Sequence, residues 1–533
     1  MSHRVLGFIL ALLLAGAGPV QAETRAAADR EILHALNRLT FGPRPGDVER
    51  VRAVGLAAWF ERQLRPESLD DSATARALGG LATLDKSIPE LLRDYPRPDP
   101  TLREKVQSGA MTRRELLERY PPEKRPVRIA AELQAAKVVR AVTSERQLRE
   151  VMVDFWFNHF NVFAGKGVVR WSVGAYEREA IRPHALGRFP DLVRATARHP
   201  AMLFYLDNWV SAREGFTVPV GPARGRTLGL NENYARELME LHTLGVDGGY
   251  TQRDVTEVAR AFTGWSIDRP RVDGRFVFRP SMHDTGAKVV LGHRLPAGGG
   301  QDDGERVIEI LTRHPSSARF VAEKLVRRFV ADAPPPALVA RVAAAYRATG
   351  GDVAAMLRVI FAAREFRSAE AWRAKVKTPL EFVASAVRAL GARVDVEGAF
   401  ALARASAEIG EPLYAAQPPT GYADRAEAWV NAGALLARMN FALALAGGRY
   451  PRVAVDLDRL VAGADPRRPD AVLERLLAAL LAGQVGPETR AVLAQQLGDP
   501  RITRLAADDR GPARTDIATL AALVLGSPEF QRR

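Results

Sequence analysis

The sequence predicts a mainly α-helical protein, a multi-helical globular fold with a small β-hairpin insertion near residues 275–291. Alanine, leucine and arginine dominate, and apolar residues recur at the spacing of an amphipathic helix in window after window. Only Arg275–Arg279 and Lys288–Leu291 alternate like short strands, on either side of Ser281–Gly286. We therefore expect these two segments to pair as a hairpin between helices.

The first residues predict a secretory signal peptide over residues 1–22. Arg4 supplies the positive start, Leu6–Leu14 the apolar run and Val20–Ala22 a small-x-small cleavage site. An uncleaved anchor is the alternative, although the apolar run is short for a bilayer. No later run is long and apolar enough for a transmembrane helix. We expect a mature chain that starts near Glu23 and is periplasmic or secreted, not an integral membrane protein.

Capping and breaking residues mark several of the expected helices. Glu31–Leu39 is a short amphipathic helix, and Asp47–Val54 and Leu56–Leu64 follow as a helical pair. Ser144 is a good N-cap for the helix that runs into the sequence DFWFNHF. Thr378–Glu381 is a strong helix start, because it combines a Thr cap, a Pro in the first position and a Glu in the third.

Chain length favours two or three domains or lobes. Beyond the signal peptide, we expect a core that carries the polar motifs, residues 23–370, and a C-terminal helical region, residues 371–533, packed on that core. Ser211–Gly229 is rich in Gly, Pro and Arg and has no periodicity. A loop of this length is predicted to be either a functional lid or partly disordered.

Composition excludes several classes of site. The chain has 533 residues, 47% of them hydrophobic, and no cysteine. Disulfides, thiol catalysis, iron–sulfur clusters, thiolate zinc sites and covalent c-type haem are therefore excluded. The sequence also lacks HExxH, Walker, GxSxG and dinucleotide-binding motifs, and only Glu31 with His34 has the ExxH spacing of which a di-iron bundle needs two. A divalent metal is the cofactor class that stays open.

The formal net charge is +14, mostly from arginine. A basic exported protein could bind an anionic polymer, lipid headgroups or cell-wall material. Alternatively, the arginines only solvate helix faces, because they are scattered and often close to Asp or Glu, and we favour this interpretation. Export also argues against nucleic acid as the physiological partner.

An unusual density of polar residues marks two short helices in Asn231–Trp265. On the first helix, one polar stripe consists of Asn233, Arg236, Glu237 and Glu240, with His242 beside it. Two carboxylates one turn apart, crossed by an arginine, can ligate a cation or serve as an acid/base pair. The same spacing suits an exposed ion-pair ladder. The catalytic candidates are Glu237 and Glu240, the metal-ligand candidates Glu237, Glu240 and His242, and the substrate-binding candidates Asn233 and Arg236.

The second helix of this segment begins at Thr251, where Asp254 stands in the capping-box position. Asp254 is thus as well explained by helix capping as by catalysis. Arg260 and Trp265 lie off the apolar face of this helix, so we expect them to close over a ligand as substrate-binding residues.

Two histidines outside that segment are candidates for catalysis. His159 lies on an apolar helical face beside Asn158, so it is either a hydrogen-bonded core residue or a functional group, and Asn158 is a substrate-binding candidate. His283 and Asp284 lie in a Gly-containing loop, and such a step suits metal ligation or general-base chemistry as well as a turn. Both are catalytic candidates, and the nearby Lys288 is a substrate-binding candidate.

Several ordered motifs resemble the large bacterial family called domain of unknown function 1800. They are His34–Gly42 (HALNRLTFG), Asp154–Phe163 (DFWFNHFNVF), Asn231–Trp265, His283–Gly292 (HDTGAKVVLG) and His314–Lys324 (HPSSARFVAEK). The resemblance implies an exported, mainly α-helical bacterial protein. It also implies a gene that often neighbours one for a second exported family, which looks similar to sulfatases and alkaline phosphatases. No established reaction comes with the family, so it assigns no catalytic residue.

Two functional hypotheses remain. The first is an exported enzyme, metal-assisted in one version, that acts on a cell-envelope or extracellular polymer at one site where Asn231–Trp265 meets the DFWFNHF helix and the HDTG loop. The alternative is a non-catalytic periplasmic scaffold, or a binding partner of the sulfatase-like exported protein, in which the polar motifs are buried hydrogen-bond networks. An enzyme should place these residues around an accessible pocket, whereas a scaffold should bury them with their partners satisfied.

Overall fold

The computed structural model describes residues 18–97, 99–221, 223–499, 503–504 and 514–533. In the following bounds, η denotes a 3-10 or π helix. The chain begins with α2 (Gly18–Leu39), α3 (Asp47–Val54), α4 (Leu56–Gln63), η1 (Pro66–Ser68), α5 (Ser72–Leu78), α6 (Ile88–Asp94), α7 (Pro100–Gln107), α8 (Arg113–Arg119) and η2 (Pro122–Lys124). It continues with α9 (Val127–Thr143), α10 (Gln147–His159), α11 (Val169–Ala175), η3 (Tyr176–Ile181), η4 (Arg182–His184), α12 (Phe189–Arg198), α13 (Pro200–Tyr205), η5 (Asn208–Val210), α14 (Glu232–Glu237), η6 (Leu238–Thr243) and α15 (Gln252–Ala261).

The strands and the remaining helices follow. The next segment contains β1 (Trp265–Asp268), β2 (Arg275–Phe278), η7 (Pro280–Met282), β3 (Lys288–Val290), β4 (His293–Leu295), α16 (Asp302–Arg313), α17 (Pro315–Phe329), α18 (Pro336–Thr349) and α19 (Val353–Ala362). The last contains α20 (Pro379–Ala389), β5 (Arg393–Val394), α21 (Val396–Ile409), η8 (Ala426–Ala428), α22 (Ala432–Ala446), β6 (Val453–Ala454), α23 (Leu457–Leu460), α24 (Pro469–Leu481), α25 (Pro487–Gln496), β7 (Thr503–Arg504), β8 (Arg514–Thr515), α26 (Ile517–Gly526) and α27 (Pro528–Gln531).

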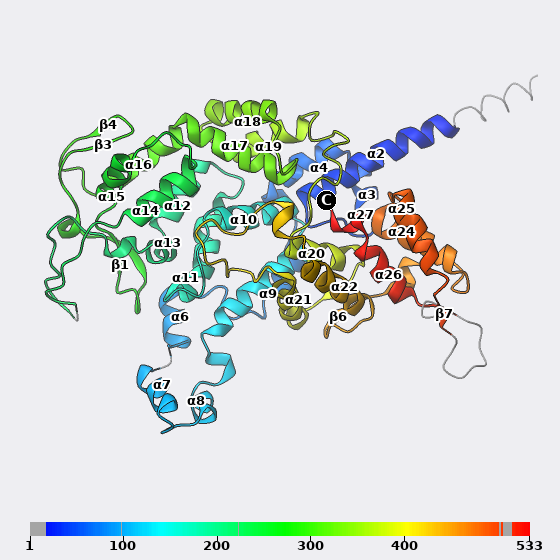
Figure 1. Ribbon diagram of the computed structural model, residues 1–533, viewed down its shortest axis with the longest axis horizontal. Coiled ribbons are helices and arrows are strands. Elements are labelled where there is room, and N and C mark those ends of the chain that lie inside the picture. The colour runs from blue at the N-terminus through cyan, green and yellow to red at the C-terminus, as the bar shows by residue number, and fades with distance from the viewer. Residues whose placement is uncertain (1–17, 98, 222, 500–502, 505–513) are drawn as a thin grey trace, which may run out of the picture.

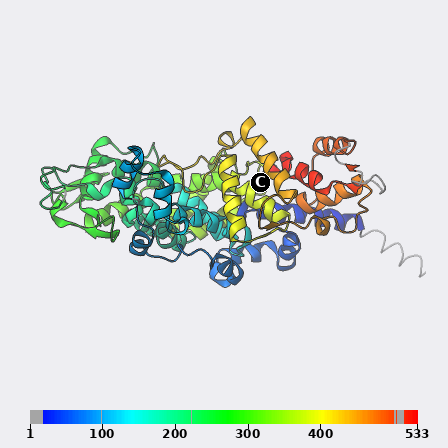
Figure 2. The same ribbon diagram turned by 90° about the horizontal axis from the view of Figure 1, so that it is seen from below.

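Helices dominate the described residues, whose strands form only four two-stranded antiparallel sheets, so the predicted mainly α fold is confirmed. The molecule is elongated (Figures 1 and 2). Strands β1–β4 lie at one end and α24–α27 at the other, while α7 and α8 project from the body as a separate pair (Figure 1). One cluster of buried apolar side chains runs from Ala35 to Phe530, so both halves of the sequence contribute to the same core.

The predicted hairpin is wrong in its pairing. Strand β2 pairs with β1, with Phe278 opposite Trp265, whereas β3 pairs with β4, with Lys288 opposite Leu295. The two alternating segments therefore belong to two separate hairpins. The physical reason is that each short strand finds its partner across the nearest tight turn, and both partners, WSID and HRL, are too short to show a pattern of their own.

Local capping signals place most helix starts correctly. Thr251 and Thr378 each form a capping box with the acidic residue three positions on. The predicted cap at Ser144 is wrong, because Arg146 is the N-cap of α10 and Ser144 closes α9 instead. The Ser144 hydroxyl still accepts a hydrogen bond of 3.0 Å from the Arg146 N–H, so it shapes the turn between these two helices.

The N-terminal prediction is only partly within the described residues. The apolar run Leu6–Leu14 lies outside them. The expected cleavage site, Val20–Ala22, falls within α2, which is continuous from Gly18 to Leu39. Over the part of the chain that the structure describes, none of the helices combines the length and the apolar character needed to cross a membrane.

Candidate active site

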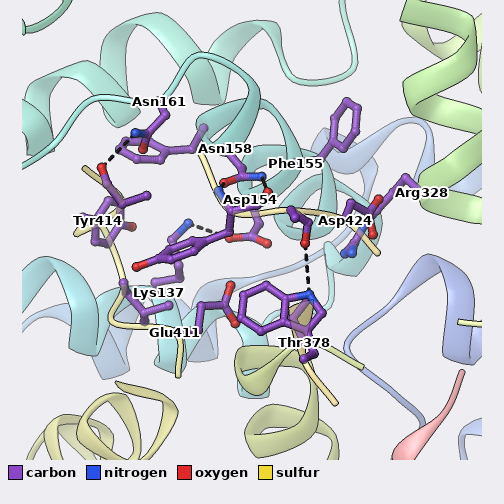
Figure 3. A pocket seen from close by; sticks show the side chains of 16 residues that line it. Lys137, Asp154, Phe155, Asn158, Asn161, Arg328, Thr378, Glu411, Tyr414 and Asp424 are labelled. Atoms are coloured by element: carbon purple, nitrogen blue, oxygen red, sulfur yellow. Dashed lines mark hydrogen bonds and ion pairs between the residues drawn. The ribbon is translucent and has the colours of Figure 1, made fainter. Parts of the chain in front are cut away.

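A small pocket lies where helix α10 meets the loop between α21 and α22, near the middle of the molecule (Figures 1 and 3). Its volume is about 60 Å³, room for a few waters or one small functional group rather than a whole substrate. The polar side chains that line it are Lys137, Asp154, Asn158, Asn161, Arg328, Thr378, Glu411, Tyr414, Tyr422 and Asp424. The pocket thus draws residues from both sides of position 370.

Helix α10 supplies one wall of the pocket. Its apolar residues Val151, Met152 and Trp156 are fully buried in the core, which turns Asp154 and Asn158 of the same helix toward the loop. The side chain of Asp154 keeps 21% of its surface exposed, so the pocket reaches solvent at this carboxylate.

Two asparagines of the DFWFNHFNVF motif form hydrogen bonds with the loop on the opposite side of the pocket. The Asn158 amide forms two hydrogen bonds with the backbone of Tyr422, and the Asn161 amide donates to the carbonyls of Ala416 and Pro418. Because both amides are engaged by backbone, these residues position the loop that closes the pocket.

A buried set of alternating charges lies beneath the pocket. The Lys137 ammonium donates a hydrogen bond of 2.9 Å to Asp154 and lies 3.8 Å from Glu177. The carboxylate of Glu177 also pairs with Arg182 at 3.0 Å and accepts a bond of 2.5 Å from the Tyr414 hydroxyl. Burial alone would raise the pKa of Glu177, but the charges of Lys137, Arg182 and Arg140 lower it to about 2. Glu177 is therefore ionised at neutral pH.

Glu411 behaves in the opposite way. It is buried, and this burial, followed by the nearby carboxylate of Asp154, raises its pKa to about 8. The backbone N–H of Leu380 donates a hydrogen bond of 2.8 Å to this carboxyl and lowers its pKa, without offsetting the first two effects. The pocket therefore contains one carboxyl that carries a proton at neutral pH beside a second that Lys137 pairs, and Figure 3 shows the three side chains turned toward the same space.

The polar stripe of the Asn231–Trp265 segment does not line this pocket. Helix α14 ends at Glu237 and becomes a π-helix, η6, so the regular 100° spacing expected through Leu244 does not hold. Burial, followed by the charge of Glu240, raises the pKa of the half-buried Glu237. The Tyr250 hydroxyl donates to Glu240 at 3.2 Å.

The substrate-binding candidates of that segment have their own partners or positions. Arg236 donates to Gln252 at 2.7 Å, and Asn233 is exposed near the start of α14. The sequence predicts that Trp265 lies outside the apolar face, and this prediction is wrong. Trp265 is fully buried, because it starts β1 and packs against Phe262. Arg260 forms ion pairs with Asp284 and Glu257, both at 2.8 Å.

His159 and His242 meet in the core. The His159 ring nitrogen Nε2 lies 3.0 Å from the His242 carbonyl oxygen, and the two ring centroids are 6.3 Å apart. Burial, followed by the charge of Lys324, lowers the pKa of both imidazoles, that of His242 to about 3. Both histidines are therefore neutral at physiological pH.

The histidine of the HDTG loop belongs to a third cluster. The two ring nitrogens of His283 lie 2.8 Å from the Thr263 carbonyl oxygen and 3.2 Å from a carboxylate oxygen of Asp303 in α16. Asp303 also accepts a bond of 2.7 Å from Lys288. His283, Lys288 and Asp303 are all buried.

The structure distributes the sequence candidates over three clusters, around His159 and His242, around Glu237 and Glu240, and around His283. Among the described contacts, His159 and His283 share no hydrogen-bond or ring partner. Within the described ranges, no group of three or more His, Asp or Glu side chains is arranged to hold a metal ion. Of the candidates, only Asn158 lines the pocket.

Sequence reasoning missed Lys137, Asp154 and Glu411 as site residues. Asp154 carried a signal, because it precedes Asn158 by one helical turn in the same polar motif. Lys137 and Glu411 carried none, since nothing in the sequence distinguishes either of them from the other charged residues nearby, such as Arg140 and Glu408. Their pairing becomes visible only when α9 and the loop after α21 pack against α10.

Comparison with known proteins places the chain without naming a reaction. No curated protein and no solved structure gives a significant match. A family match covers residues 34–532, nearly the whole chain. The chain therefore belongs to the family described as protein of unknown function DUF1800.

Proposed function

We propose that the protein is an exported enzyme that carries out acid–base catalysis in the pocket formed by Lys137, Asp154 and Glu411. One observation carries the proposal. Two of the three carboxyl groups that line this pocket lie in contrasting environments: burial raises the pKa of Glu411 to about 8, while Asp154 lies 2.9 Å from the Lys137 ammonium. Paired carboxyls in such contrasting environments are the usual arrangement for a general acid and a general base.

Each residue has a distinct role in this proposal. Glu411 keeps its proton at neutral pH and donates it to a leaving oxygen or nitrogen. Asp154, held by Lys137 and open to solvent, accepts a proton from an attacking water. The volume of about 60 Å³ admits only the reacting group, so the rest of the substrate lies outside the pocket. This suits a polymer better than a small metabolite.

The signal peptide expected from the sequence supports a cell-envelope or extracellular polymer as the substrate. A metal-assisted version of the reaction was expected from the Glu237 and Glu240 stripe. The proposed chemistry assigns no step to a metal ion, because both proton transfers have a protein group in place.

The test is a comparison of the mature protein with Glu411→Gln, Asp154→Asn and Glu237→Gln. Each is incubated with purified peptidoglycan and envelope polysaccharide, and released reducing ends and amines are quantified by mass spectrometry. We expect product from wild type, loss of about 100-fold or more in the two pocket variants, and little change in Glu237→Gln. The proposal is wrong if Glu237→Gln loses activity while the folded Glu411→Gln variant keeps it.

A second function is favoured by a different observation. Asn158, Asn161, Tyr414 and Tyr422 already have hydrogen-bond partners within the protein. This is expected of a non-catalytic periplasmic scaffold, or of a partner for the sulfatase-like exported protein. Co-expression with the product of such a neighbouring gene, followed by size-exclusion chromatography, tests it: a stable complex that survives Glu411→Gln would favour the scaffold.

A further inference from the structure

A groove of about 660 Å³ lies between α8 and the body of the molecule. One side is formed by α8 and the segment that leads into α9, including Tyr120 and Arg125. The other is formed by the loop before α11 and by Arg170 and Trp171. This groove is about ten times larger than the acid–base pocket, so it has room for several sugar-sized units.

The lining of this groove is basic, and none of the described residues that form it is acidic. Arg97, Arg125, Arg170 and Arg271 all face it. A second groove beside α16 also contains several arginines, but there Glu305 pairs with Arg194 at 2.9 Å, and Glu309 pairs with two more, at 2.9 and 3.2 Å. The interpretation favoured from composition, in which arginines lie close to Asp or Glu, therefore fits the second groove but not the first.

Two of the four guanidinium groups are held in place. Arg125 donates a hydrogen bond of 2.7 Å to the Tyr120 carbonyl, and Arg97 lies over the Trp171 ring at 5.2 Å from its centroid. The Trp171 indole is itself fixed by a hydrogen bond of 2.8 Å to the Tyr95 carbonyl. Preorganised guanidinium groups bind carboxylate, sulfate or phosphate at lower entropic cost than mobile ones.

The other two arginines are available for a ligand. Within the described residues, no side-chain hydrogen bond or ion pair involves Arg170 or Arg271. Between the cations, Leu117 and Val127 expose 40% and 58% of their surfaces. A ligand that fits must therefore carry several negative groups and present apolar faces between them.

We propose that this groove binds an anionic glycan strand, whose acidic groups pair with Arg125, Arg170 and Arg271 and whose sugar rings lie on Leu117, Tyr120 and Val127. A glycan fits better than a membrane, because the cations line a concave channel rather than a convex tip. Export, expected from the sequence, argues against nucleic acid.

The groove also adjoins the acid–base pocket. Asn161 lines the pocket and Gly165 the groove, and four residues of chain span at most about 14 Å. The intervening Ala164 donates a hydrogen bond of 3.1 Å to the carbonyl of Tyr414, which ties this segment to the pocket wall. A glycan strand that binds in the groove can therefore extend into the acid–base pocket. This placement rests on the proposed function, whereas the binding of the glycan in the groove does not.

The test measures binding by titration calorimetry at about 50 and 200 mM salt, with the Glu411→Gln variant so that no turnover intervenes. The probes are polygalacturonate oligosaccharides for carboxylates, heparin oligosaccharides for sulfates and neutral dextran as the control. In this background, Arg170→Ala with Arg271→Ala is compared with Arg313→Ala with Arg347→Ala, which removes the same charge from the second groove.

We expect one acidic glycan to bind and dextran not to bind. The Arg170 and Arg271 substitutions should weaken binding about 10- to 100-fold and flatten its salt dependence, whereas the control pair should have little effect. Equal losses in both double variants would show non-specific attraction and overturn the proposal. So would binding to phosphatidylglycerol vesicles with no binding to either glycan. Normal glycan binding without any turnover by wild type would instead refute the acid–base function alone.

Discussion

The side-chain amide of Asn158 pairs with both backbone groups of Tyr422. Its Nδ2 donates a hydrogen bond of 2.8 Å to the Tyr422 carbonyl, and its Oδ1 accepts one of 2.7 Å from the Tyr422 N–H. A single side chain of α10 thus satisfies both backbone groups of Tyr422, in a loop that is remote in sequence, as a neighbouring β-strand would. This pairing is what places the wall that contains Tyr414 and Tyr422 opposite Asp154.

The substitution Asn158→Ala should lower the free energy of unfolding by about 2–4 kcal/mol, because it removes two hydrogen bonds and leaves two backbone groups without partners. Urea denaturation followed by tryptophan fluorescence measures this. The matched control is Asn233→Ala, at an exposed position, which should change stability by less than about 0.5 kcal/mol. Equal effects of the two substitutions would contradict the structural role of the pairing.

Gly421 allows the loop to come this close. An added Cβ would lie 2.3 Å from the Asn158 carbonyl oxygen, and the residue has a φ of +67°. We expect Gly421→Ala to cost about 2 kcal/mol more than Gly463→Ala, where φ is +88° but nothing lies within 4 Å, because only the first combines backbone strain with a clash. Thermal unfolding of both variants measures the difference, and similar melting temperatures would show that the loop has room to shift.

The sequence predicts local structure here better than it predicts the site. Helical periodicity and the capping boxes at Thr251 and Thr378 depend on neighbouring residues, so they are visible without the fold. The partner of β2 and the change to a π-helix after Glu237 depend on packing, so they are not visible from the sequence alone. The pocket is least visible, because Glu411 acquires its raised pKa only from burial and from Asp154, which the fold brings from another part of the chain.

Glu411 should give the folded protein a characteristic pH dependence. Its pKa is about 8 in the folded state and near the ordinary value of 4.5 when unfolded, so the folded state binds the extra proton between these values. The contribution to stability is therefore fully present below about pH 4.5 and lost as the pH rises through 8, with a slope of up to about 1.4 kcal/mol per pH unit.

Glu411→Gln removes this proton and should flatten the decline between pH 5 and pH 8.5, as measured by urea denaturation across that range. At the alkaline end the variant should be more stable than wild type, because it has no carboxylate to bury. A wild-type curve that does not fall over this range would mean that Glu411 is ionised in the folded protein, and would remove the proton donor from the proposed mechanism.

Lys137 is the cation that pairs with Asp154 and also lies close to Glu177. Lys137→Met keeps the length of the side chain but leaves Asp154 without its partner and Glu177 with only its arginines. We expect a loss of about 1–3 kcal/mol in the free energy of unfolding, because Asp154 loses a charged hydrogen-bond partner and the buried Glu177 loses one of its cations. Lys166→Met is the control, since its pair with Asp207 is partly exposed, at 36% and 51% of the two side chains, and should contribute no more than about 1 kcal/mol. Similar losses would show that the pocket is more hydrated than its burial indicates.

The His283 cluster should respond as structure rather than as catalysis. Asp303 accepts from the buried Lys288 ammonium and lies beside His283, so Asp303→Asn leaves that ammonium with carbonyl partners alone. The expected cost is about 3–5 kcal/mol in urea denaturation, against less than about 0.5 kcal/mol for the exposed neighbour in Asp302→Asn. A different result is that Asp303→Asn leaves stability unchanged and abolishes turnover of the polymer substrate. This result would support the catalytic role expected for the HDTG loop and contradict catalysis in the pocket at Glu411.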